Sequence, residues 1–321
     1  MPLARYIKFE TQANFTDETF GVSGADSHII DPVGEDITGD KQFIYPRTAG
    51  IRNQRAHIKG KNKFSGTIDA PLYPTHAVSL IYYAMGAVST TTGTPTTGTN
   101  THIITKANTV PFFRMAIGRD LRQHEYVGGI INSMSVDYTM DDIITGSFDV
   151  MFRKELPNEA LETSEAFLDF DENERAFGGA ESSVTIDASA DDRIESFSVT
   201  LENNVADDAY SLGSEFLPAG IIAALNVTGS SDMRFDTISE YDAFINETNR
   251  AIVLTGAFGS ADLTRSVAFD IPVVNYDTNN LPTDNFERYV QTLAWTAEPD
   301  SNSDPLIVTV KNAQVAAAFA G

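Results

Sequence analysis

The sequence predicts a mainly β protein made of two tandem β-sandwich domains, and three observations lead to this prediction. First, residues 124–153 alternate apolar and polar side chains in two arms, the period-two pattern of a long amphipathic hairpin. Second, a similar pattern recurs in residues 286–296 and 304–312, which we interpret as a second hairpin. Third, 321 residues suffice for two cores of about 100–150 residues each. We expect domains at 1–190 and 191–321, each with one short helix and one such hairpin.

Composition narrows the class of protein. The chain is 42% hydrophobic and 10% aromatic, a globular profile. Its formal net charge of -23, from 45 acidic and 22 basic residues, disfavours binding of nucleic acid through a basic face. Cysteine is absent, which excludes disulfides and thiolate metal sites. We find no signal peptide and no run near the roughly 20 apolar residues of a membrane helix, so we expect a soluble protein made in a cytoplasm, without membrane contact.

The first half begins with an expected strand over residues 5–15, followed by a long polar loop over residues 16–50. The next residues, 51–63, form the basic island of an acidic chain. We interpret it either as a contact surface for an acidic partner, such as a second copy, or as a solvated strand. The candidate inter-subunit contacts are Arg52, Arg55, Lys59 and Lys61.

A helix is predicted from Pro74 to Met85, after a short strand at 64–69. Pro74 and Thr75 suit a helix start, and Gly86 suits the position just past its end. Its apolar stripe, which we expect in the core, consists of Ala77, Leu80, Ile81 and Ala84. The loop at 89–101 is of low complexity and is expected to be exposed, and strands are expected at 102–105 and 110–118.

The hairpin of residues 124–153 turns at residues 139–142. Met134, Val136 and Tyr138 form the apolar face of its first arm, and Phe148 and Val150 continue this face on the return. The opposite face carries hydroxyl and acidic side chains, at Ser133, Ser135, Asp137, Thr145, Ser147 and Asp149.

An acid-rich segment, 155–192, contains an expected strand at 182–187 that finishes the first domain. The second half repeats the element order: strands at 194–201 and within 221–235, a helix over 239–247 capped by Ser239, and strands at 250–259 and 265–275. The hairpin at 286–312 closes the chain, with Trp295 expected in the core.

Signatures of catalysis and of metal binding are missing from the sequence. The five histidines have no metal-ligand spacing, and the calcium-loop-like run at Asp169, Asp171 and Asn173 has Glu174 where glycine is required. We find no nucleophile elbow, phosphate-binding glycine loop or dinucleotide fingerprint. We therefore expect no enzyme activity, no cofactor and no dedicated metal site.

Two segments carry a resemblance to a known family: IESFSVTLENNVADDAYSLGS (194–214) and GIIAALNVTGSSDMRFD (220–236). Together with the element order, they resemble the tail tube proteins of long-tailed bacteriophages and related archaeal viruses, in the version that carries two tube domains in one chain. The resemblance implies a virion tail protein, assembled in the host cytoplasm, whose trimeric rings stack into a tube for DNA delivery. It also implies contacts with tape measure, tail terminator and tail-tip proteins.

Within that resemblance, we expect the polar face of the hairpin to line the lumen. A hydroxyl and acidic wall lets DNA pass without specific binding, whereas a basic wall would hold its phosphates. The early loop, the 89–101 loop and the basic island would then be ring-to-ring contacts. Two alternatives stay open: another virion β-sandwich, such as a tail terminator or capsid decoration protein, and a carbohydrate-binding adhesin module using Trp295, Tyr82 or Tyr289.

Overall fold

The structure is a computed structural model that describes residues 6–18, 28–30, 32–47, 56–93, 99–157, 175–259, 264–281, 288–301 and 303–313. It is mainly β with antiparallel strand pairing, as the sequence predicted, and its described residues include two α-helices. The elements are β1 (Tyr6–Gln12), β2 (His28–Ile30), β3 (Gly34–Glu35), β4 (Thr38–Ile44), β5 (Ile58–Pro71), α1 (Pro74–Met85), β6 (Gly86–Thr91), β7 (Asn100–Lys106), β8 (Phe112–Arg119), β9 (Arg122–Thr139), β10 (Thr145–Glu155), the 3-10 helix η1 (Gly179–Glu181), β11 (Ser182–Ile186), β12 (Ser189–Asp191), β13 (Ile194–Glu202), β14 (Asn226–Arg234), α2 (Ser239–Ile245), β15 (Arg250–Phe258), β16 (Arg265–Asn280), β17 (Val290–Ala297) and β18 (Ile307–Asn312).

The predicted central hairpin is confirmed as β9 and β10, which pair along most of their length. Met134, Val136 and Phe148 are fully buried on one face, because their alternation places them together on the core side of the pleat. Among the described residues this hairpin has more paired positions than any other pair of strands, with one bulge between Asp149 and Val150.

β9 pairs with three strands of the sheet. One of its edges pairs with β10, whereas the other pairs with β8 up to Gly129 and with β13 from Ser133 onward. Asn132 is the extra residue between these stretches, since Ser133 lies opposite Asp149 and Ile131 opposite Val150. Its side chain donates from Nδ2 to Asp149 Oδ2 at 2.7 Å and accepts from the backbone N–H of Val205 at 3.0 Å. This β-bulge lets β8 turn away from the sheet while β13 continues it.

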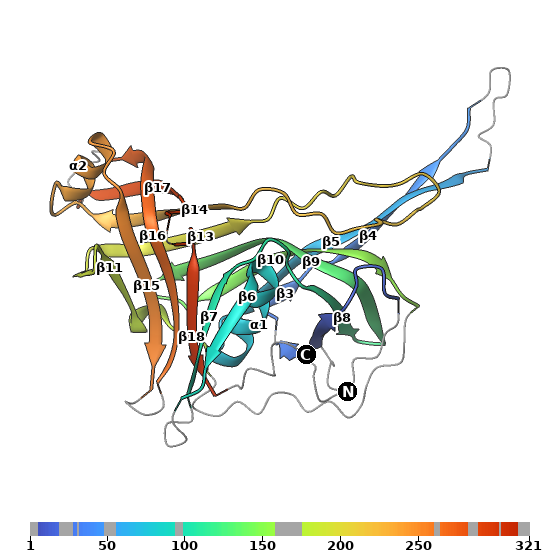
Figure 1. Ribbon diagram of the computed structural model, residues 1–321, viewed down its shortest axis with the longest axis horizontal. Coiled ribbons are helices and arrows are strands. Elements are labelled where there is room, and N and C mark those ends of the chain that lie inside the picture. The colour runs from blue at the N-terminus through green and yellow to red at the C-terminus, as the bar shows by residue number, and fades with distance from the viewer. Residues whose placement is uncertain are drawn as a thin grey trace.

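The resulting long sheet runs β4, β5, β10, β9, β13, β14, β17 and the end of β16. A second run of strands is β6, β7, β18, the start of β16, β15, β11 and β12. β1 and β2 extend from β8. In Figure 1 the β4 and β5 arm projects from one end of the molecule, and α2 lies at the opposite end.

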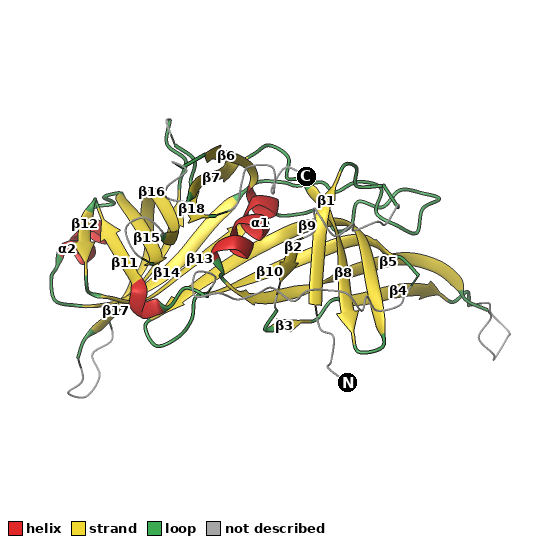
Figure 2. Cartoon of the chain, turned by 90° about the horizontal axis from the view of Figure 1, so that it is seen from below, coloured by secondary structure: helices red, strands yellow, loops and turns green. Residues whose placement is uncertain are grey.

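Helix α1 lies in the core, as predicted. It begins at Pro74 and ends at Met85, and Gly86 follows with φ of 100°, a left-handed conformation that glycine adopts without steric cost. Leu80, Ile81 and Ala84 are buried, and the helix contacts β9, β7 and β18 (Figure 2). The side chain of Ala77 lies outside the described part of the chain.

The predicted C-terminal hairpin is wrong. β17 lies between β14 and β16, whereas β18 lies between β16 and β7. The alternation in both strands is real, and Trp295 is buried as expected, but alternation fixes only which face is buried and not which strand is the neighbour. The successive strands that pair in the second half are instead β13 with β14 and β15 with β16.

Two smaller expectations also need correction. Ser239 is the first helical residue of α2 and not its cap; the N-cap is Ile238, with no side-chain cap bond, and the Ser239 hydroxyl donates to Glu240 Oε1 at 3.0 Å. The long early loop contains β2, β3 and β4, because β2 pairs with β1 whereas β3 and β4 pair with β5.

Three pairings connect the two halves of the sequence. β9 pairs with β13, β7 with β18 and β11 with β15, and one hydrophobic cluster contains Phe148 as well as Trp295. Strand β11, expected to finish the first half, therefore pairs with the second. The division into domains at 1–190 and 191–321 stays a prediction.

Candidate functional site

The candidate site is the polar face of the long sheet. All six predicted lumen-facing residues lie on this face as three directly opposed cross-strand pairs, namely Asp137 with Thr145, Ser135 with Ser147 and Ser133 with Asp149. None of the six is buried, and Asp137 is exposed. The opposite face of the same strands forms the core, so the hairpin is amphipathic as the sequence indicated.

The face continues into the second half of the chain, which sequence reasoning missed. Ser198, Thr200 and Glu202 of β13 lie opposite Asp137, Ser135 and Ser133 of β9. Further members of the face follow from the same registers: Thr67 and Asp69 on β5, Ser196 on β13, Asn226, Thr228, Ser230 and Asp232 on β14, and Thr292 and Thr296 on β17. The polar alternation of β13 and β14 was visible in the sequence, but the pairing of β13 with β9 was not.

Hydroxyl groups hold several of the carboxylates on this face. Asp232 accepts hydrogen bonds from Ser196 at 2.8 Å and from Thr292 at 2.6 Å. Asp69 accepts one from Ser147 at 2.6 Å. These side chains are acidic, hydroxyl or amide groups, and the basic residues that continue the same alternation, Arg153 on β10 and Arg234 on β14, lie at the two ends of the face. The middle of the face therefore offers mainly acidic and hydroxyl groups.

Asp137 lies near the turn of the hairpin, opposite Thr145. Partial desolvation by the surrounding sheet raises the pKa of its carboxyl above the ordinary value of 3.8.

One end of this face is covered by residues 203–225, which connect β13 to β14 and which we name the strap. Leu217 of the strap packs in a small apolar cluster with Phe15, Ile130 and Met151. The strap runs along the arm formed by β4 and β5 (Figure 1), and the Tyr210 hydroxyl donates to the backbone oxygen of Asn62 at 2.6 Å.

The basic island meets acidic and aromatic side chains of the strap. Lys63 forms an ion pair with Asp207 at 2.6 Å, and this hydrogen bond raises the pKa of the lysine. Lys59 lies 3.8 Å from the Glu215 carboxylate, and the Lys61 ammonium lies 5.1 Å from the ring centre of Tyr210. Two of the predicted inter-subunit contacts thus have partners within the chain. The other two, Arg52 and Arg55, lie outside the described residues, and the intermolecular role of all four stays a prediction.

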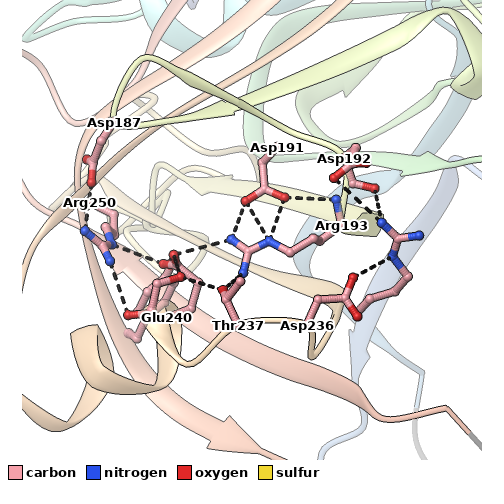
Figure 3. A network of polar contacts seen from close by, with 11 residues as sticks. Asp187, Asp191, Asp192, Arg193, Asp236, Thr237, Glu240 and Arg250 are labelled. Atoms are coloured by element: carbon pink, nitrogen blue, oxygen red, sulfur yellow. Dashed lines mark hydrogen bonds and ion pairs between the residues drawn. The ribbon is translucent and has the colours of Figure 1, made fainter.

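A buried ionic network anchors α2 at the other end of the molecule (Figure 3). The carboxylate of Glu240 is only 3% exposed. It accepts hydrogen bonds from Arg250 Nε at 3.1 Å and the Tyr276 hydroxyl at 2.9 Å, and the Arg193 guanidinium lies 3.6 Å away. Sequence reasoning missed Glu240, because an acid in the first turn of a helix is usually a solvated partner of the helix dipole.

Two further carboxylates complete the network. Asp187 binds Arg250 at 2.8 Å, and Asp191 accepts a bidentate bond from Arg193. Burial disfavours the charged form of Asp191, but the bonds and the charge of Arg193 outweigh this effect and lower its pKa. The network ties α2 to β15, to β16 and to the turn before β13.

Two other properties of the described residues bear on function. They contain no cluster of three or more histidines and acids able to hold a metal ion. No helix among them is both long and apolar enough to cross a membrane. The calcium-loop-like run at 169–174 lies outside the described residues.

These features define a mainly β protein whose long sheet presents one continuous acidic and hydroxyl face. Residues 8–297 match the phage tail tube protein family, and the chain belongs to that family. It is thus a structural protein of a virion tail, which supports the expectation that it is not an enzyme. Comparison with curated proteins gave no match.

Proposed function

We propose that copies of this chain assemble into rings of three that stack into the tail tube, and that the polar face of the long sheet lines the channel through which viral DNA passes. The observation that carries the proposal is the continuity of this face over six strands, β5, β10, β9, β13, β14 and β17. A wall of this kind ends in two strand edges whose backbone N–H and C=O groups are unpaired. These groups are satisfied when strands of neighbouring copies close the sheet into a barrel.

The two edges of the long sheet support closure by neighbouring copies. Among the described residues, β3 and β4 pair only with β5, and residues 276–280 of β16 pair only with β17. All seven residues of β4 are exposed. We infer that these edges, at opposite sides of the sheet, join adjacent chains around the ring.

The charge of the face suits the passage of DNA. Duplex DNA carries one phosphate charge per ~1.7 Å of axis, so lysines on the wall would hold it. Carboxylates repel it over about 8 Å at physiological salt, which prevents adhesion in a narrow channel.

Electron microscopy and genome ejection test the proposal. Purified protein should form hollow tubes as its concentration rises, and a monomer at high concentration would overturn the assembly proposal.

The double variant Asp137→Lys and Asp149→Lys should slow ejection while leaving tubes intact. The control, Asp141→Lys with Glu298→Lys, makes the same charge change outside the strands and should leave ejection unchanged. Equal ejection by wild type and the Asp137/Asp149 variant would contradict the lumen assignment.

Tape measure, tail terminator and tail-tip proteins remain the proposed partners, with assembly in the host cytoplasm. The carbohydrate-binding alternative loses its strongest candidate, since Trp295 is 1% exposed and cannot stack on a sugar. Family membership favours the tube over a terminator or decoration protein.

A further inference from the structure

Two exposed apolar patches lie at opposite ends of the molecule. The first, which we name the arm tip, consists of Phe43, Ile44, Tyr45 and Ile58, each between 44% and 57% exposed. Phe43 and Tyr45 both stack edge-on against His57, with ring centres 4.5 and 6.0 Å apart. The arm tip is therefore a clustered surface and not a set of isolated side chains.

The second patch, which we name the α2 face, consists of Ile238, Tyr241 and Ile245. These side chains are 60%, 38% and 57% exposed, and their spacing of three and four residues places them on one side of α2. The Glu240 network holds the opposite side of the helix (Figure 3). The α2 face is thus fixed before any partner binds.

The two chain segments that carry the patches have opposite charges. The described arm residues 38–47 and 56–61 carry four Lys or Arg residues (Lys41, Arg47, Lys59 and Lys61) against one acid, Asp40. Residues 236–247 carry four acids and no Lys or Arg. Of these acids, Asp236, Asp242 and Glu247 are exposed, whereas Glu240 is buried.

The patches also lie at opposite ends of the same sheet. The arm extends β5 beyond the Phe64 and Phe152 pair, whereas α2 follows Arg234, the last residue of β14, at the other end of the strands. Both views of the molecule place them at the two ends of its long axis (Figures 1 and 2). A polymer that grows along the strands by one repeated contact must bring one end of each copy against the other end of the next.

We propose that the arm tip of one copy docks on the α2 face of a copy in the next ring, as an apolar contact surrounded by lysine and arginine on one side and carboxylates on the other. This inference rests on the proposed tube, and it names the surface that receives the arm. The partner is a second copy because both halves of the contact, with matching apolar character and opposite charge, are present on every chain.

Cross-linking tests the contact directly, since the chain contains no cysteine. Tyr45→Cys and Tyr241→Cys proteins, one carrying a size tag, are mixed, assembled and treated with a bismaleimide of about 8 Å span. The mixture should give a heterodimer band, and each variant alone should not. Leu121→Cys, at an 87% exposed site elsewhere, replaces Tyr241→Cys as the control and should not cross-link to Tyr45→Cys.

Charge reversal gives an independent readout. Lys41→Glu with Arg47→Glu, or Asp242→Lys with Glu247→Lys, should each raise the protein concentration needed for tube formation by about tenfold, the effect of losing an important interface contact. The four changes combined in one chain should restore assembly, which a merely structural defect would not allow.

The outcomes separate this inference from the proposed function. If tubes form but give no heterodimer, or give Tyr241→Cys homodimers in its place, the docking of the arm on α2 is wrong and the proposed tube assembly is unaffected. Failure of wild-type protein to polymerise at any concentration would overturn both.

Discussion

Replacement of Glu240 by glutamine should destabilise the protein, because it removes a buried carboxylate that Arg193 and Arg250 share. Glu240 is 3% exposed, and the side chains of Arg193 and Arg250 are 13% and 19% exposed. Glutamine keeps the shape and one acceptor oxygen, but its NH2 group would face a guanidinium or the Tyr276 hydroxyl. The two arginines would each retain one carboxylate, Asp191 or Asp187.

The magnitude follows from the burial of these groups. Removing one partner of a fully buried ion pair costs about 3–5 kcal/mol, since the remaining charge is left uncompensated. Each arginine here keeps a second carboxylate, so we expect a smaller loss of about 2–3 kcal/mol for Glu240→Gln. For a chain of this size each kcal/mol lowers the melting temperature by roughly 2–3 °C, which gives a decrease of about 4–9 °C.

Thermal unfolding followed by circular dichroism, with urea unfolding in parallel, measures this loss. Glu240→Ala should cost more than Glu240→Gln, because it removes the last acceptor and leaves a cavity. Asp242→Asn, an exposed acid on the same helix, should leave the melting temperature within about 1 °C, as expected of a surface substitution. Equal stability of Glu240→Gln and wild type would refute the view that this network fixes α2.

Three further substitutions test other parts of the fold. Gly229→Ala should cost about 1–3 kcal/mol or more in urea unfolding, because a methyl group there would clash with the indole of Trp295 and with a strand backbone oxygen. Asn132→Ala should cost about 1–3 kcal/mol, since it leaves a backbone N–H without its partner at the bulge. Asp191→Asn should make the free energy of unfolding depend less on pH in acid. Arg193 lowers the pKa of Asp191 below 3.8, so the Asp191 carboxylate contributes its full stabilisation at higher pH and loses it as the pH falls below about 4.

Each of these substitutions has a matched control or a contrary result. Gly34→Ala should be tolerated, since its added methyl would meet only the Asp69 carboxylate, at 3.8 Å. Ser135→Ala, on the same face as the bulge, should leave stability within about 0.5 kcal/mol. An unchanged loss of stability below pH 4 in Asp191→Asn would contradict the role assigned to its carboxylate.

Local periodicity was enough to predict most strands and helix α1. Pro74 and Gly86 mark the ends of α1 through backbone chemistry that acts within a few residues, so no tertiary information was needed. The polar face of β9 and β10 was predicted for the same reason, because the two arms are joined by a short turn that brings them side by side.

Pairing between distant segments could not be predicted. The alternation of β17 is satisfied equally by β18 or by β14 as neighbour, and the fold uses β14. The acids of the strap also look like solvated loop residues in the sequence. Their partners, Lys59 and Lys63, lie about 150 residues earlier, and nothing local records this proximity. Such contacts depend on the order of the strands in the sheet, which cannot be deduced from the local pattern of a single sequence.

The bulge at Asn132 explains how one hairpin can serve both halves of the chain. Without the extra residue, the edge of β9 that pairs with β8 would continue with β8, and the polar face would stop at β9. With it, β8 turns away and β13 takes the next seven positions, Ser133 to Thr139. The channel wall proposed above is therefore continuous across both halves before any copies meet. The proposed assembly would use the two sheet edges, where β4 and residues 276–280 each pair with one neighbour among the described residues, and the two ends of the molecule, where the arm tip and the α2 face expose apolar side chains.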